Sequence, residues 1–84
     1  MTKQRIIVEL AEVKYHFYVS KHPQNDQLGF IFKAYFKGDL VAGFVPDSHH
    51  HLQLSENYGH LNPITLNLLV NQIEILDVYG FFEQ

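Results

Sequence analysis

The 84-residue sequence predicts an α+β fold: a four- or five-stranded antiparallel β-meander with one C-terminal α-helix packed on one face of the sheet. Apolar and polar residues alternate over the first half of the chain, and turn-forming residues separate these stretches. An Asn-Pro pair at 62–63 then opens a longer segment with helical periodicity. The connections between the alternating stretches are short, which favours antiparallel neighbours. We expect a single domain over residues 1–84, because so short a chain cannot form two cores.

Three strands follow from the period-two pattern. Residues 5–10 and 13–20 have apolar side chains at alternate positions, and residues 11–12 between them are short enough for a hairpin turn. Residues 28–36 repeat the pattern after a segment of turn-forming residues, 21–27. Each stretch is therefore predicted to be a half-buried strand.

Two further strands complete the predicted sheet. Lys-Gly-Asp at 37–39 indicates a tight turn, and residues 40–45 form a fourth strand that Pro46 interrupts. Residues 51–54 are a candidate fifth strand at the sheet edge.

The predicted helix spans residues 63–79. Asn62 is a favoured N-cap residue, Pro63 suits the first helical position, and Gly80 suits a left-handed stop. Residues 73–79 are rich in β-forming residues, so a shorter helix followed by a final strand is the alternative.

The predicted helix has two apolar stripes on opposite sides. At 100° per residue, one stripe comprises Leu66, Leu69, Val70, Ile73 and Leu76. The other comprises Ile64, Leu68, Ile75, Val78 and Tyr79. Because a surface helix normally needs one stripe to cover its sheet, the second predicts a contact with another protein.

Composition and charge limit the class of protein. The chain is 46% hydrophobic and 18% charged, which excludes disorder over most of its length. It has no cysteine, so disulfides and cysteine-based metal sites are excluded. No apolar run is long enough to span a bilayer and the N-terminal residues do not resemble a signal peptide, so we expect a cytoplasmic protein without membrane association.

The sequence contains no motif for catalysis. The glycines form neither a dinucleotide-binding nor a P-loop pattern, and none of the serines occupies a Gly-x-Ser-x-Gly turn. We therefore expect a protein that is not an enzyme and has no cofactor.

Three consecutive histidines at 49–51 suggest a weak metal site. On a strand, His49 and His51 point to the same side and suit zinc or another transition metal, and His60 is a candidate third ligand. The alternative is a solvated loop or edge strand.

All six basic residues lie in the first 37 positions, where the net charge is +3, whereas the remainder carries −6. If Ile6 and Phe17 face the helix, the opposite sheet face gathers basic and tyrosine side chains, as in binders of single-stranded nucleic acid. That candidate set is Arg5, Lys14, Tyr18, Lys33, Tyr35 and Lys37.

The function expected from these patterns is a small non-catalytic protein-interaction module, most simply a homodimer. Its candidate contact residues are Ile64, Leu68, Ile75, Tyr79, Phe81 and Phe82. The alternative for these residues is ordinary core packing. Nucleic-acid binding by the sheet face and metal binding by the histidine segment are the two other candidate functions.

Overall fold

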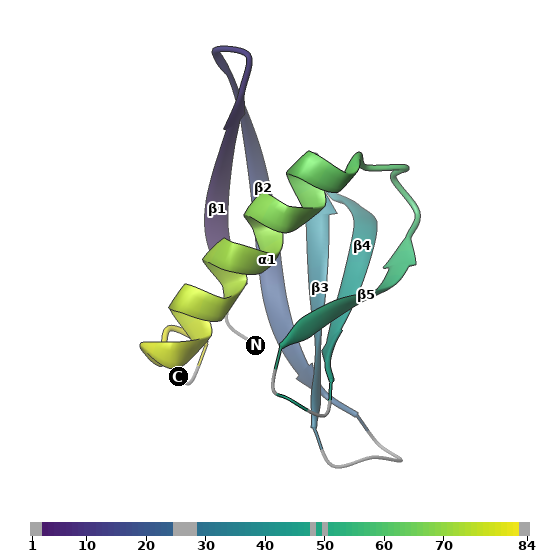
Figure 1. Ribbon diagram of the computed structural model, residues 1–84, viewed down its shortest axis with the longest axis vertical. Coiled ribbons are helices and arrows are strands. Elements are labelled where there is room, and N and C mark those ends of the chain that lie inside the picture. The colour runs from purple at the N-terminus through teal and green to yellow at the C-terminus, as the bar shows by residue number, and fades with distance from the viewer. Residues whose placement is uncertain (1–2, 25–28, 48, 50, 83–84) are drawn as a thin grey trace.

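The computed structural model describes residues 3–24, 29–47, 49 and 51–82. Within these residues, five strands form one antiparallel sheet in sequence order, and a helix lies across one face of it (Figure 1). The strands are β1 (Lys3–Leu10), β2 (Val13–Pro23), β3 (Phe30–Phe36), β4 (Asp39–Pro46) and β5 (Leu52–Asn57). The helix is α1 (Pro63–Val78). The predicted α+β meander with one C-terminal helix is confirmed.

Three strands extend beyond their predicted ends. β4 includes Pro46, which pairs with Leu52 of β5, so the prediction that Pro46 interrupts this strand is wrong. β2 continues to Pro23, which pairs with Phe30 of β3, although the sequence places a turn there. Proline is tolerated at this position because it is the last residue of the strand. β5 continues to Asn57, which pairs with Ala42 of β4, whereas the prediction ends at residue 54.

The two tight turns have the geometry that twisted hairpins require. Ala11 and Glu12 between β1 and β2 have φ values of 48° and 66°, and Lys37 and Gly38 between β3 and β4 have 51° and 87°. Positive φ at both central residues is the condition for a type I′ turn, whose twist matches that of the flanking strands. The hairpins therefore continue the right-handed twist of the sheet.

Helix α1 begins and ends at capping residues. The Asn62 side chain accepts a hydrogen bond from the Thr65 N–H at 2.8 Å, and Pro63 occupies the first turn. At the other end Gly80 has φ 78°, and its N–H donates to the backbone carbonyl of Asp77. The Phe81 N–H donates to the backbone carbonyl of Leu76. This pair of bonds is a Schellman cap. Residues 73–78 are helical, so the alternative of a final strand is wrong.

The core lies between α1 and the inner face of the sheet. The sheet contributes alternate side chains from four strands, and α1 contributes Leu69 and Ile73. The buried strand residues include Ile6, Val8, Phe17, Val19, Phe32, Ala34, Ala42 and Phe44. In the described part of the chain, no helix is long and apolar enough to cross a membrane.

Candidate functional site

The residues of α1 that are most exposed are uncharged, and its two acidic residues, Glu74 and Asp77, are half-buried. We call the surface formed by these exposed residues the neutral helix face; it comprises Pro63, Ile64, Asn67, Asn71, Gln72, Ile75 and Val78. Of its apolar members, Ile75 is 50% exposed and Val78 is 82% exposed. A solvated helix face is ordinarily rich in charge, so this composition is unusual for a surface that faces water.

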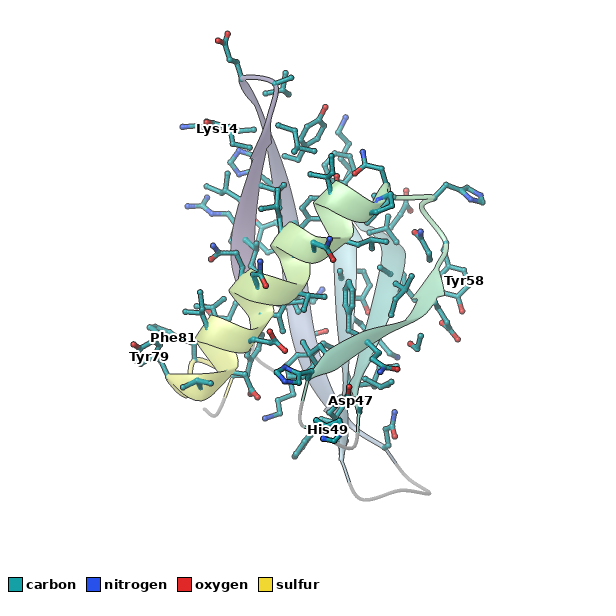
Figure 2. All side chains as sticks on the ribbon, in the orientation of Figure 1. Lys14, Asp47, His49, Tyr58, Tyr79 and Phe81 are labelled. Carbon is teal, nitrogen blue, oxygen red and sulfur yellow. The ribbon has the colours of Figure 1, made fainter. Side chains whose placement is uncertain are left out.

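Aromatic side chains continue this face beyond the helix end. Tyr79 is 75% exposed, and Phe81 is also exposed. Figure 2 shows both residues at the C-terminal end of α1. The apolar character of the face is therefore concentrated around Ile75, Val78, Tyr79 and Phe81.

Two predicted contact residues lie elsewhere. Leu68 is half-buried and packs against the core, because it lies on the flank of a helix whose buried line is Thr65, Leu69 and Ile73. Phe82 is 7% exposed, and its ring packs edge-on against Phe32 with the centroids 5.3 Å apart. Leu68 therefore leaves the neutral helix face, and Phe82 belongs to the core of the chain.

The two acidic side chains of α1 hold the helix to the sheet. Lys21 Nζ lies 2.9 Å from Asp77 Oδ1, and this lysine lies on the inner face of β2 beneath the end of the helix. Glu74 Oε2 accepts the Leu52 N–H at 3.1 Å, which ties α1 to the start of β5. Both carboxylates are half-buried and bonded to the sheet, and Glu74 borders the neutral helix face beside Asn71, Ile75 and Val78.

A cleft of about 660 Å³ lies beside these bonds. It opens between the C-terminal half of α1 and the ends of β2, β3 and β4. Its polar lining comprises Lys21, Asp47, His51, Glu74 and Asp77, and its apolar lining includes Phe30, Phe32, Leu52 and Val78. Sequence reasoning missed this cleft, because its residues come from segments up to 57 positions apart and no local motif joins them.

The outward side of β1, β2 and β3, opposite the helix, is basic. Strand alternation places on it the basic residues Lys3, Arg5, Lys14 and Lys33 and the acidic residue Glu9. We call this surface the basic sheet face. The strand register aligns Arg5 with Tyr18 and Tyr18 with Tyr35, and the neighbouring row aligns Lys3 with Ser20 and Ser20 with Lys33.

The predicted nucleic-acid set therefore divides. Arg5, Tyr18, Lys33 and Tyr35 come together in these two rows. Lys14 lies four positions before Tyr18 in β2, roughly 13 Å from it. It pairs with Glu9 of β1 near the tip of the β1–β2 hairpin (Figure 2).

The structure changes the assignment of two further lysines, Lys37 and Lys3. Lys37 lies in the β3–β4 turn, with its Nζ 5.4 Å from the Phe36 ring centroid. Lys3 was missed because the predicted strand began at residue 5; extending the same alternation back by two residues identifies it.

A serine and a histidine form a hydrogen bond within the basic sheet face. Ser20 Oγ lies 2.6 Å from His22 Nε2. Burial, and then the charges of Lys33 and Lys3, lower the pKa of His22 from its ordinary value. Ser20 is only 1% exposed, so its hydroxyl is closed to a substrate. The pair is a structural hydrogen bond, and the strand register places Ser20 between Lys3 and Lys33.

The structure does not bring the predicted ligands His49, His51 and His60 together as a metal-binding group. His51 precedes the first residue of β5 and His60 follows the last, so a six-residue strand, roughly 20 Å long, separates them. Among the residues that the structure describes, no group of three or more His, Cys, Asp or Glu side chains is close enough to hold a metal ion. Asp47 instead accepts hydrogen bonds from the backbone N–H groups of His49 and His51, at 2.8 and 3.0 Å (Figure 2).

Comparisons of this chain with protein-family models, curated proteins and solved structures find no match.

Proposed function

We propose that this chain is a small non-catalytic protein-interaction module that pairs with a second copy of itself through the neutral helix face. The observation on which the proposal rests is that the apolar side chains on one side of α1 are at least half exposed while the most exposed residues there are uncharged. Burying a side chain such as Ile75 or Val78 completely contributes about 1.5–3 kcal/mol, so a partner surface over this region is favourable.

The net charge is one reason to expect the contact between two copies at an uncharged surface. The chain carries a formal net charge of −3, which gives a net repulsion between two copies at long range. The neutral helix face contributes no charge of its own to this repulsion. Two copies related by a two-fold axis pack this face against itself, with the α1 helices antiparallel and their dipoles opposed.

Amide and aromatic side chains suit the same contact. Asn71 and Gln72 border Ile75 on the exposed side, and their amides have both donors and acceptors for a self-complementary interface. Tyr79 and Phe81 provide the aromatic area that protein interfaces favour.

The test is molar mass in solution, measured by size-exclusion chromatography with light scattering over a range of concentrations. We expect the wild type at twice 9.8 kDa and the Val78→Asp variant at 9.8 kDa, with the circular dichroism spectrum of the folded chain retained. Tyr58→Asp is the matched control, because Tyr58 is exposed but lies outside α1. A monomeric wild type would contradict self-pairing. A dimeric Val78→Asp variant would place the interface elsewhere.

A further inference from the structure

The basic sheet face combines cationic side chains with an exposed aromatic ring. Arg5 and Tyr18 are directly paired across β1 and β2, and both are exposed. Tyr18 is 46% exposed, so one ring is accessible for stacking. Tyr35 is the next residue in the row, but its ring is covered by Lys3 Nζ, 4.7 Å from the centroid. Tyr18 is therefore the stacking surface, and Tyr35 positions a lysine.

The cations are concentrated on this side of the molecule. Lys3 and Lys33 lie on either side of Ser20 in one row across the strands. The row of Arg5 and Tyr18 is two residues away along the strands, at a spacing of roughly 6.6 Å. Burial lowers the pKa of His22, and the nearby charges of Lys33 and Lys3 lower it further. On the opposite side of the sheet, the charged residues of α1 are Glu74 and Asp77. The outward side is thus positive over β1–β3 although the whole chain is acidic, and Glu56 of β5 lies in the row of Lys33, beyond Gly43.

Cations beside a solvent-open ring match one ligand chemistry in particular. Phosphate groups pair with Lys and Arg, and an unpaired base stacks on an exposed tyrosine. A base pair in a duplex keeps its π-faces stacked on its neighbours, so only a single strand can use Tyr18 in this way. An acidic peptide satisfies the cations but leaves the ring without a matching group.

We infer that the basic sheet face binds single-stranded nucleic acid, with phosphates at Lys3, Arg5 and Lys33 and a base stacked on Tyr18. Neither the neutral helix face nor the dimer proposed above contributes to this surface. The two proposals therefore succeed or fail separately.

The test is fluorescence anisotropy with fluorescein-labelled 15-nucleotide dT and U oligomers and a 15-base-pair duplex. With three phosphate contacts on a single strand, affinity falls about 20-fold between 50 and 200 mM salt. Arg5→Ala and Lys33→Ala each weaken binding and reduce the slope of log affinity against log salt by about 0.7. Tyr18→Ala weakens binding about 5-fold or more without changing the slope, whereas Tyr18→Phe retains affinity.

Two variants are matched controls. Lys37→Ala removes the same charge from the β3–β4 turn, and Tyr79→Ala removes an exposed tyrosine from the opposite side of the molecule. We expect both to bind as the wild type does. The Val78→Asp variant should also bind, since it leaves the sheet unchanged. Circular dichroism establishes that each variant is folded.

Four results would overturn the inference, the last of them from a competition with poly-glutamate. The first is equal affinity for single strand and duplex. The second is binding by Tyr18→Ala that equals the wild type, and the third is a loss in Lys37→Ala as large as that in Arg5→Ala. Poly-glutamate is the competing polyanion: displacement of the oligomers by it at equal charge concentration would identify a general surface for acidic protein and contradict the nucleic-acid assignment.

Discussion

Lys21 of β2 and Asp77 of α1 form an ion pair at 2.9 Å although they are 56 residues apart in the sequence. The pair joins the last turn of α1 to the C-terminal part of β2. The lysine ammonium also lies 4.2 Å from the Phe30 ring centroid. These contacts fix a cation on the apolar side of the sheet, where it needs a partner.

We predict that Asp77→Asn lowers the free energy of unfolding by about 1–2 kcal/mol. The substitution removes the negative charge from a largely buried lysine, and the value stays below that of a fully buried pair because Asp77 is partly exposed. Urea denaturation measures the change. Asp39→Asn, at the exposed start of β4, is the control and should change stability by less than about 0.5 kcal/mol. Equal effects of the two substitutions would contradict a specific role for the ion pair.

Asp47 predicts a pH dependence of stability. Hydrogen bonds from the backbone N–H groups of His51 and His49 lower the pKa of this carboxyl below its ordinary value of 3.8. The unfolded chain therefore takes up a proton at a higher pH than the folded chain does. The stabilising contribution of Asp47 is present above pH 3.8 and is lost as the pH falls through the pKa of the folded state.

Thermal unfolding at pH 7, 5, 4 and 3 tests this dependence by comparing the wild type with Asp47→Asn. We expect the difference in melting temperature to shrink as the pH falls below 4, because Asp47 itself then becomes protonated. The other carboxyl groups titrate in both proteins and cancel in the difference. A difference that stays constant from pH 7 to pH 3 would show that the charge of Asp47 does not contribute.

The sequence predicted those parts of the fold that depend on local signals. Alternation identified the strands, and Asn62, Pro63 and Gly80 identified the ends of the helix because capping uses neighbouring residues. Pro23 was assigned to a turn on composition, since a strand-terminal proline has the same local appearance as a turn proline.

The candidate site was less predictable, since it depends on the rotation of α1 about its axis and on contacts between residues far apart in the sequence. Periodicity placed Leu68 on the outer stripe, but it could not show how far the helix is rotated toward the sheet. The partnership of Lys21 with Asp77 has no local signal. The two rows of the basic sheet face depend on strand register, which the short turns fix but the composition does not.

Substituting Phe81 and Phe82 by alanine should lower the free energy of unfolding by very different amounts. Phe82→Ala removes a ring from the core beside Phe32 and should lower the free energy of unfolding by about 3 kcal/mol. Phe81→Ala should lower it by less than about 1 kcal/mol, because its ring is exposed and its carbonyl still accepts the Gln4 side-chain hydrogen bond. Urea denaturation in the Val78→Asp background separates these effects from dimerisation. Comparable losses for both substitutions would mean that the tail packs as a unit.

The pKa of His22 tests the arrangement of the basic sheet face directly. Burial lowers this pKa first and the charge of Lys33 lowers it further. Lys33→Ala should therefore raise it toward its ordinary value of 6.5, whereas Lys37→Ala should leave it unchanged. The measurement is the pH titration of the His22 ring signals by NMR.

The same shift determines the sign of the accompanying effect on stability. Because the pKa of His22 is lower in the folded chain, the unfolded chain binds the proton first as the pH falls below 6.5. The wild type therefore loses stability over that range, and Lys33→Ala should lose less of it. If the titration of His22 were unchanged in Lys33→Ala, the Lys33 ammonium would not lie beside Ser20 and His22. The row of cations on which nucleic-acid binding depends would then be wrong.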